Sequence, residues 1–107
     1  MYSSHKEIKI LDTQTKSEVL DIGHYSFISF LFPVMDDGDV TFEVSNLKGG
    51  IYLPLKKMDG SAVTFVCGTG EKASPYVDEL AGHRYVKVVS ATPQTADRTI
   101  TVIFKWR

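Results

Sequence analysis

Residues 80–90 have the sequence LAGHRYVKVVS, and residues 99–104 have the sequence TITVIF. Apolar and polar residues alternate in both segments, which is the pattern of a β-strand with one buried and one solvated face. A polar loop rich in Thr, Gln and Asp separates the two segments. Nothing in this region has the spacing of a catalytic or metal-binding motif. We therefore predict two β-strands here, Arg84–Ser90 and Thr99–Lys105.

The same period of two recurs along most of the chain, and no window of eleven residues has a convincing helical stripe. In residues 40–45, for example, Val40, Phe42 and Val44 alternate with polar side chains. We expect an all-β fold, an antiparallel β-sandwich of about eight strands with at most one short helix. The other six predicted strands are Glu7–Leu11, Glu18–Ile22, Ser26–Phe32, Val40–Ser45, Ile51–Lys56 and Ala62–Cys67.

Glycine and proline mark the connections between these strands. Asp59 and Gly60 form a hairpin-turn signal, because glycine tolerates the positive φ that tight turns require. Pro54 has no amide to donate, which predicts an edge or a bulge in its strand. One helix of about two turns is predicted between Ser74, which would cap it, and Gly82, which would end it.

The composition is that of an ordinary folded domain, and we expect one domain over residues 1–107. The chain has 43% hydrophobic and 23% charged residues and a formal net charge of -1. Without clustered Lys and Arg, nothing favours nucleic acid as a partner. The longest apolar run, residues 30–34, is far shorter than the ~20 residues of a membrane span. No secretory signal is evident at the start, so we expect no membrane partner and retention in a cytoplasm.

Reactive residues form no pattern that points to catalysis. His5, His24 and His83 are scattered, whereas a zinc site needs three or four converging ligands. Cys67 ends an apolar segment without a nearby base and is expected to behave as a small hydrophobe. Residues 36–39, Asp-Asp-Gly-Asp, suggest calcium, but the full twelve-residue loop is missing and a solvated turn is favoured. We therefore predict no enzyme activity, no metal site and no cofactor.

The predicted strand around residues 27–32 carries large apolar side chains on both faces. Such a strand is either covered on both sides or exposes apolar surface for a partner. We take Phe27, Leu31 and Phe32 as a candidate protein interface. Arg84 and Tyr85, a cation beside an aromatic residue on a strand, are added to this candidate interface.

Aromatic residues support an alternative function. Tyr52, Tyr76 and Trp106 could form a platform on which sugar rings stack, or they could pack at the core and rim of the sandwich. The sequence leaves both interpretations open.

Several short pieces of the chain, in their order and spacing, carry a resemblance to a known family. They are Leu20–Gly23, Pro33, Val40–Ser45, Asp59–Gly60, Leu80–Lys87, Ser90 and Gln94–Ile100. Together, over residues 17–104, they resemble small proteins encoded among the structural genes of tailed bacteriophages. The resemblance implies a β-sandwich virion protein without a catalytic site, placed on the capsid as a decoration, head fibre or spike base. A tail or baseplate location is the alternative.

The resemblance also implies partners. Such a protein would form a homo-oligomer, a dimer or a trimer, and would dock on other virion proteins such as the major capsid protein. It would be located in the virion, after assembly in the bacterial host cytoplasm. Residues 84–87 also resemble a strand of galactose-binding-like sandwiches, so binding of host-surface glycans is the second hypothesis. The expected topology is therefore jelly-roll or galactose-binding-like.

Overall fold

The computed structural model describes residues 2–23, 25, 27–36, 39–67 and 70–106. Within these ranges the chain forms nine strands and one turn of 3-10 helix. They are β1 (Tyr2–Ile10), β2 (Leu20–Asp21), β3 (Phe27–Phe32), β4 (Asp39–Ser45), β5 (Leu53–Pro54), β6 (Phe65–Val66), β7 (Lys72–Ala73), η1 (Asp78–Leu80), β8 (Tyr85–Ser90) and β9 (Arg98–Trp106).

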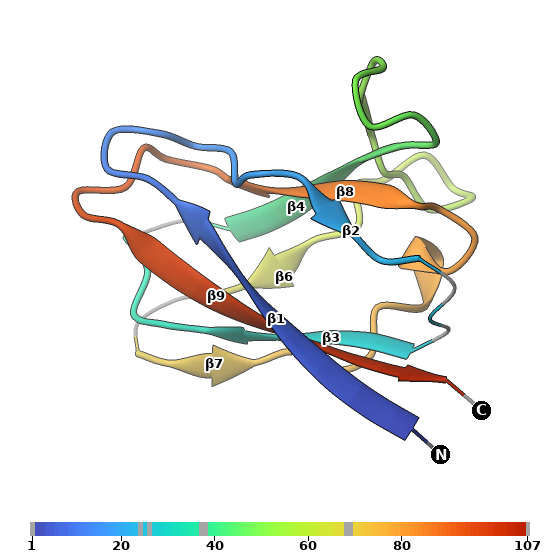
Figure 1. The fold of residues 1–107 in the computed structure, drawn as a ribbon. Helices are drawn as coiled ribbons and strands as arrows, with labels where there is room; N and C mark the ends of the chain where they lie inside the picture. Colours follow the sequence, from blue (N-terminus) through green and yellow to red (C-terminus); the bar gives the residue numbers. More distant parts are fainter. Residues whose placement is uncertain (1, 24, 26, 37–38, 68–69, 107) are drawn as a thin grey trace.

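The strands form two antiparallel sheets packed face to face (Figure 1). Sheet A has the strand order β1-β9-β3-β7, and sheet B has the order β2-β8-β4-β5, with β6 also paired to β4. The first strand therefore pairs with the last, and the second with the second from last. This interleaving of the two halves of the chain is the jelly-roll arrangement of a β-sandwich. The predicted all-β sandwich is confirmed, and its topology is the jelly-roll one.

The alternating pattern of the sequence places one side of each long strand in the core. In β4 the residues Val40, Phe42 and Val44 are buried, and in the neighbouring β8 Val86 and Val88 are buried. The register brings these residues together, with Phe42 opposite Val88. Since successive side chains of a strand point to opposite faces, the polar residues between them face solvent.

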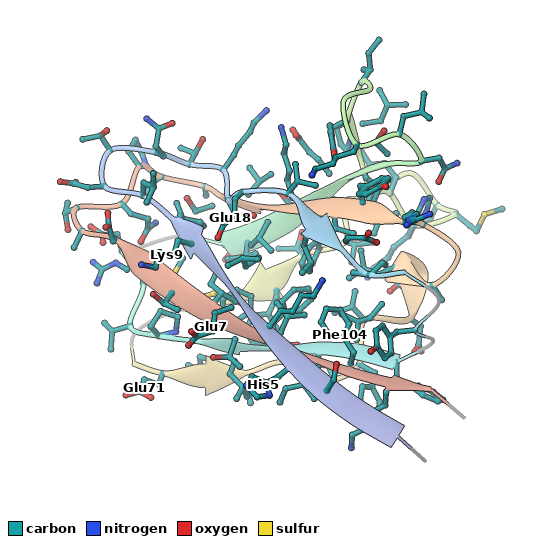
Figure 2. All side chains as sticks on the ribbon, in the orientation of Figure 1. His5, Glu7, Lys9, Glu18, Glu71 and Phe104 are labelled. Atoms are coloured by element: carbon teal, nitrogen blue, oxygen red, sulfur yellow. The ribbon has the colours of Figure 1, made fainter. Side chains whose placement is uncertain are left out.

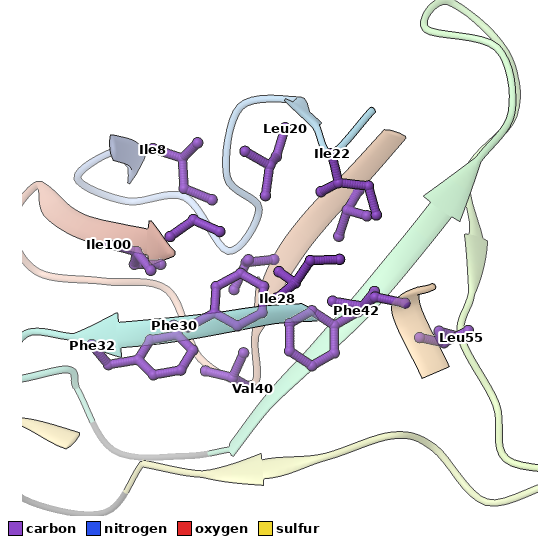
Figure 3. Close-up of a cluster of buried hydrophobic side chains, with 14 of the residues drawn as sticks. Ile8, Leu20, Ile22, Ile28, Phe30, Phe32, Val40, Phe42, Leu55 and Ile100 are labelled. Carbon is purple, nitrogen blue, oxygen red and sulfur yellow. The ribbon is translucent and has the colours of Figure 1, made fainter. Parts of the chain in front are cut away.

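Aromatic rings fill the space between the sheets (Figure 3). Phe30 of β3 is fully buried, and its ring centroid lies 5.2 Å from that of Phe42 and 5.8 Å from that of Phe32. Phe32 in turn stacks on Phe65 at 5.3 Å. Phe30 of sheet A thus packs against Phe42 of sheet B, which joins the two layers.

The eight strands predicted from the sequence all have a counterpart, but three of them are much shorter than predicted. The structure has only Leu20–Asp21, Leu53–Pro54 and Phe65–Val66 where five or six residues were expected. Each of these strands pairs with one neighbour only, so few backbone groups find a partner. Pro54 lies in the edge strand β5, as its missing amide predicted.

The predicted two-turn helix is wrong. Only Asp78–Leu80 form one 3-10 turn, and Ser74 does not cap it. Instead, the N–H groups of Ser74 and Val77 donate to the carbonyl oxygens of Phe30 and Ile28, both at 2.8 Å. These residues thus run alongside β3 as an extended segment. The segment also includes β7, a strand that the sequence did not predict. Pairing with β3 satisfies backbone groups that a helix would have used internally.

The predicted turn at Asp59 and Gly60 is confirmed. Gly60 has φ +88°, and Asp59 Oδ1 accepts hydrogen bonds from the amide and the hydroxyl of Ser61 at 2.9 and 2.6 Å. In the described part of the chain no helix is long and apolar enough to cross a membrane.

Truncation of Phe30 tests the packing between the sheets. We expect Phe30→Ala to lower the free energy of unfolding by about 3–5 kcal/mol, because it leaves a cavity between the two layers. Met58→Ala is the matched control, since Met58 is fully exposed and its truncation should change stability by about 0.5 kcal/mol or less. Urea unfolding measures both, and equal losses in the two variants would contradict this description of the core.

Candidate protein-binding surface

The outer face of sheet A carries two of the predicted interface residues, Phe27 and Leu31. Phe27, Ser29 and Leu31 of β3 point outward, because Ile28, Phe30 and Phe32 point into the core. On β9 the residues opposite them are Lys105, Ile103 and Thr101. Leu31 is 42% exposed, and Phe27 and Ile103 are half-buried.

An aromatic pair closes one corner of this face. The ring of Tyr76 lies 5.2 Å from that of Phe27, and the Lys105 Nζ lies 5.7 Å from the centre of the Tyr76 ring. Tyr76 comes from the segment that follows β3, and it is 42% exposed. We call Phe27, Leu31, Tyr76 and Ile103 the apolar strip. It is continuous because residues diagonally opposite on neighbouring strands are within side-chain reach.

Charged and polar groups border the apolar strip. His5 of β1 stands opposite Ile103, and Glu7 stands opposite Thr101. In Figure 2 the labelled His5 and Glu7 lie along β1, and Glu71 lies at the end of β7. An apolar centre with a polar border is the composition of many protein interfaces.

The structure divides the predicted interface residues between three places. Phe27 and Leu31 lie together in the apolar strip. The inclusion of Phe32 is wrong, because its side chain is only 2% exposed and belongs to the core. Arg84 and Tyr85 lie on sheet B, on the opposite side of the sandwich, where the Arg84 guanidinium pairs with Asp21 at 3.4 Å.

Of the three aromatic residues of the glycan alternative, the structure describes the side chains of Tyr52 and Tyr76, and these two lie apart. Tyr76 belongs to the outer face of sheet A. The Tyr52 ring is instead covered by Lys87 of sheet B, whose Nζ lies 4.4 Å from the ring centre, and its hydroxyl donates to the Lys48 carbonyl at 2.7 Å. The side chain of Trp106 lies outside the described residues. Tyr52 and Tyr76 are thus on different sheets and form no common platform.

A second group of exposed apolar side chains lies on the segment that connects β4 to β6. Figure 1 shows this segment, in green, projecting from one end of the sandwich. Its exposed residues are Leu47, Ile51, Leu53 and Met58. They are spread over two turns and one edge strand, so they form a less regular surface than the apolar strip.

Reactive groups are not gathered into a site. Within the described ranges, no three His, Cys, Asp or Glu side chains converge to hold a metal ion, and His24 lies outside these ranges. Cys67 is buried, and burial together with the Asp39 carboxylate raises the pKa of its thiol. A thiol of this kind is a poor nucleophile.

The acidic run at residues 36–39 contributes to structure through Asp36, while Asp37 and Gly38 lie outside the described residues. The Asp36 carboxylate accepts hydrogen bonds from the Arg98 guanidinium and from the Thr95 hydroxyl, the latter at 2.9 Å. These donors lower the pKa of Asp36 below its usual 3.8. The Asp36 amide donates to the Oε1 of Gln94 at 2.9 Å, and Gln94 is 2% exposed.

This polar network ties three loops together. The amide of Thr13 donates to the Gln94 carbonyl at 2.8 Å, and the Gln94 side chain donates to the Thr92 carbonyl at 3.1 Å. Both the Oε1 and the Nε2 of this buried amide therefore have a partner, as buried polar atoms usually do. Gln94 therefore anchors one end of the sandwich, a role that its place in a polar loop did not reveal.

Neither a family model nor a curated protein matches this chain. Among solved structures, the SPBc2 prophage-derived protein YomS is similar over 97% of this chain and 95% of its own, with a TM-score of 0.56 and 14% sequence identity. This likeness shows the fold. A structure of Bacillus endospore appendages, described as a novel family of disulfide-linked pili, matches over 99% of this chain and 88% of its own. Its TM-score of 0.46 and 19% identity are too low to support an argument.

The pKa of Asp36 gives a pH-dependent prediction. Asp36→Asn should lower the melting temperature at neutral pH, because Arg98 and Thr95 lose the carboxylate that they share. The folded-state pKa lies below the unfolded value, so the stabilisation is fully present above about pH 4 and is lost as the pH falls through the folded pKa.

Thermal unfolding of the wild type and Asp36→Asn between pH 7 and pH 2 measures this effect. The difference in melting temperature should shrink toward the acid end. Glu79→Gln, at an exposed carboxylate, is the control and should show no such difference. A difference that is independent of pH would show that the Asp36 charge does not act as described.

Proposed function

We propose that this protein is a non-enzymatic structural component of a tailed-bacteriophage virion that binds the shell through the outer face of sheet A. The role is that of a capsid decoration, head fibre or spike-base protein, and the major capsid protein is the partner. The apolar strip is the observation that carries this proposal. The virion, assembled in the bacterial host cytoplasm, is the proposed location.

The chemistry of the apolar strip favours a protein partner. The solvent face of an antiparallel sheet is normally polar, whereas here Phe27, Leu31, Tyr76 and Ile103 share that face. Small-molecule sites are concave and enclose most of their ligand, but a sheet face is flat. A flat apolar surface with a polar border is instead complementary to another protein surface.

A small contact area is sufficient for a protein that binds in many copies. Stable interfaces bury about 1,600 Å² in total, which is a large share for a chain of this size. Linked copies of an oligomer bind with higher avidity, so each copy needs less area. The jelly-roll fold, which is common in capsid proteins, and the likeness in fold to a prophage-derived protein are compatible with this role.

The glycan hypothesis has weaker support. A sugar-binding platform needs converging aromatic rings and hydrogen-bonding groups. Tyr76 has Phe27 beside it, but Tyr52 lies on the other sheet and is covered by Lys87. Lys105 lies over the Tyr76 ring, with its Nζ 5.7 Å from the ring centre, and an aromatic pair on a flat sheet face favours protein docking over glycan recognition.

Replacement of Leu31 by lysine tests the docking surface. We expect Leu31→Lys to weaken binding to shells of the cognate major capsid protein by about tenfold or more, or about 1.4 kcal/mol, because a charge would be buried in an apolar contact. Co-sedimentation of the purified protein with shells that lack it measures the affinity.

Val66→Lys is the matched control, since Val66 is an exposed apolar residue on β6 of sheet B. It should bind as the wild type does. Equal affinities for the wild type and Leu31→Lys, or a loss only in Val66→Lys, would overturn the proposed docking surface.

A further inference from the structure

Among the described strands, β1 is the one long strand at a sheet edge. It has nine residues and pairs only with β9. The other edge strands in the described structure, β2, β5, β6 and β7, have two residues each, and β5 contains Pro54. Proteins usually keep edge strands short or interrupt them, because an open edge can pair with another chain. The long edge of β1 is therefore an exception in this fold.

The backbone groups on the outer edge of β1 can be assigned from Lys9. The Lys9 amide donates to Glu18 Oε1 at 3.1 Å, and the Lys9 carbonyl accepts from the Glu18 amide at 3.2 Å. Both groups of Lys9 therefore point away from β9. Because backbone groups of a strand alternate between its two edges, the N–H and C=O groups of Ser3, His5 and Glu7 point the same way.

A groove lies beside part of this edge. In Figure 2 Glu18 lies beside Lys9, whereas His5 and Glu7 lie farther along β1, away from it. β1 and β2 are separated by a groove that is lined by Lys6, Glu7 and Ile8 on one side and by Glu18, Leu20 and Asp21 on the other. Of the segment Ser3–Glu7, Lys6 and Glu7 line this groove.

We propose that the Ser3–Glu7 edge pairs antiparallel with the same segment of a second copy of this chain. The pairing joins the two copies of sheet A into one continuous sheet about a two-fold axis, so that each copy presents the same surface to the other. The inference rests on the proposed function for the role of the oligomer. It goes further than that function because it names the contact that forms the dimer.

The charges and the backbone groups favour the register with the two-fold axis at His5. Ser3 of each copy then stands opposite Glu7 of the other, and His5 opposite His5, so that all three residues use both backbone groups. On the inner face Lys6 stands opposite Ser4. A two-fold axis at Lys6 would place Lys6 opposite Lys6, and an axis at Glu7 would place Glu7 opposite Glu7. Like charges directly opposite each other are unfavourable.

The pairing has a consequence for docking. With the two-fold axis perpendicular to the sheet, the outer faces of both copies lie on the same side. The two apolar strips then form parts of one larger surface, and the dimer binds a shell with two contacts instead of one.

A disulfide across the axis tests this register. We expect His5→Cys to form a covalent dimer on mild oxidation, because residues directly opposite in a hydrogen-bonded pair have Cα atoms about 5.5 Å apart, within the range of a disulfide. The natural Cys67 is buried and should not interfere. Non-reducing electrophoresis and intact mass measure the dimer.

Glu7→Cys is the matched control, since the two Glu7 Cα atoms would be about 13 Å apart along the strand direction. The expected result is a cross-linked fraction at least about tenfold larger for His5→Cys. The proposed pairing is overturned if Glu7→Cys cross-links as fast as His5→Cys, or if neither variant cross-links more than the wild type does.

Leu31→Lys in the His5→Cys background separates this inference from the proposed docking surface. The covalent dimer should still form, because Leu31 lies in the middle of sheet A and not at its edge. If shell binding depends on Leu31 but His5→Cys forms no cross-link, the edge pairing alone is refuted. A cross-link with shell binding that is unaffected by Leu31→Lys would refute the docking surface alone.

Discussion

The burial of alternate side chains between two sheets is the constraint on which the rest of the structure depends. Phe30 of β3 and Phe42 of β4 pack against each other across the layers, and the chain has no disulfide to replace this contact. Because a strand has a period of two, fixing Phe30 in the core also fixes Leu31 on the outside. The surface that we assign to docking is thus a direct consequence of how the core packs.

The long strands could be predicted from the sequence because their burial pattern is local. β4 alternates cleanly, and β8 and β9 alternate apart from Val89 and Ile103, so the core and solvent sides of Val40–Ser45 follow from the letters alone. Residues 27–32 are apolar on both faces. Only the packing of the two sheets determines which of these faces is buried and which stays exposed. β7 and the extended segment after it have no apolar alternation, and they form because β3 offers backbone partners. No local signal encodes that partner.

The candidate surface could be predicted only in part, since the sequence does not state which strands share a sheet. Phe27 and Leu31 share one face of β3, whereas Arg84 and Tyr85 lie on the other sheet. Ile103 could have been found, because it is the apolar residue of TITVIF that is out of phase with Ile100, Val102 and Phe104. The contact of Tyr76 with Phe27 and the bond of Arg98 to Asp36 join distant segments, so only the fold reveals them.

In the proposed function, sheet A recognises other proteins, while sheet B completes the core. Hydroxyl-radical footprinting of the free protein and of the protein bound to its shell tests this most directly, because it reports the accessibility of individual side chains. We expect Leu31, Tyr76 and Ile103 to become protected on binding, while the exposed Val66 of sheet B stays as reactive as before. Protection of Val66 with unchanged reactivity of Leu31 and Tyr76 would contradict the account.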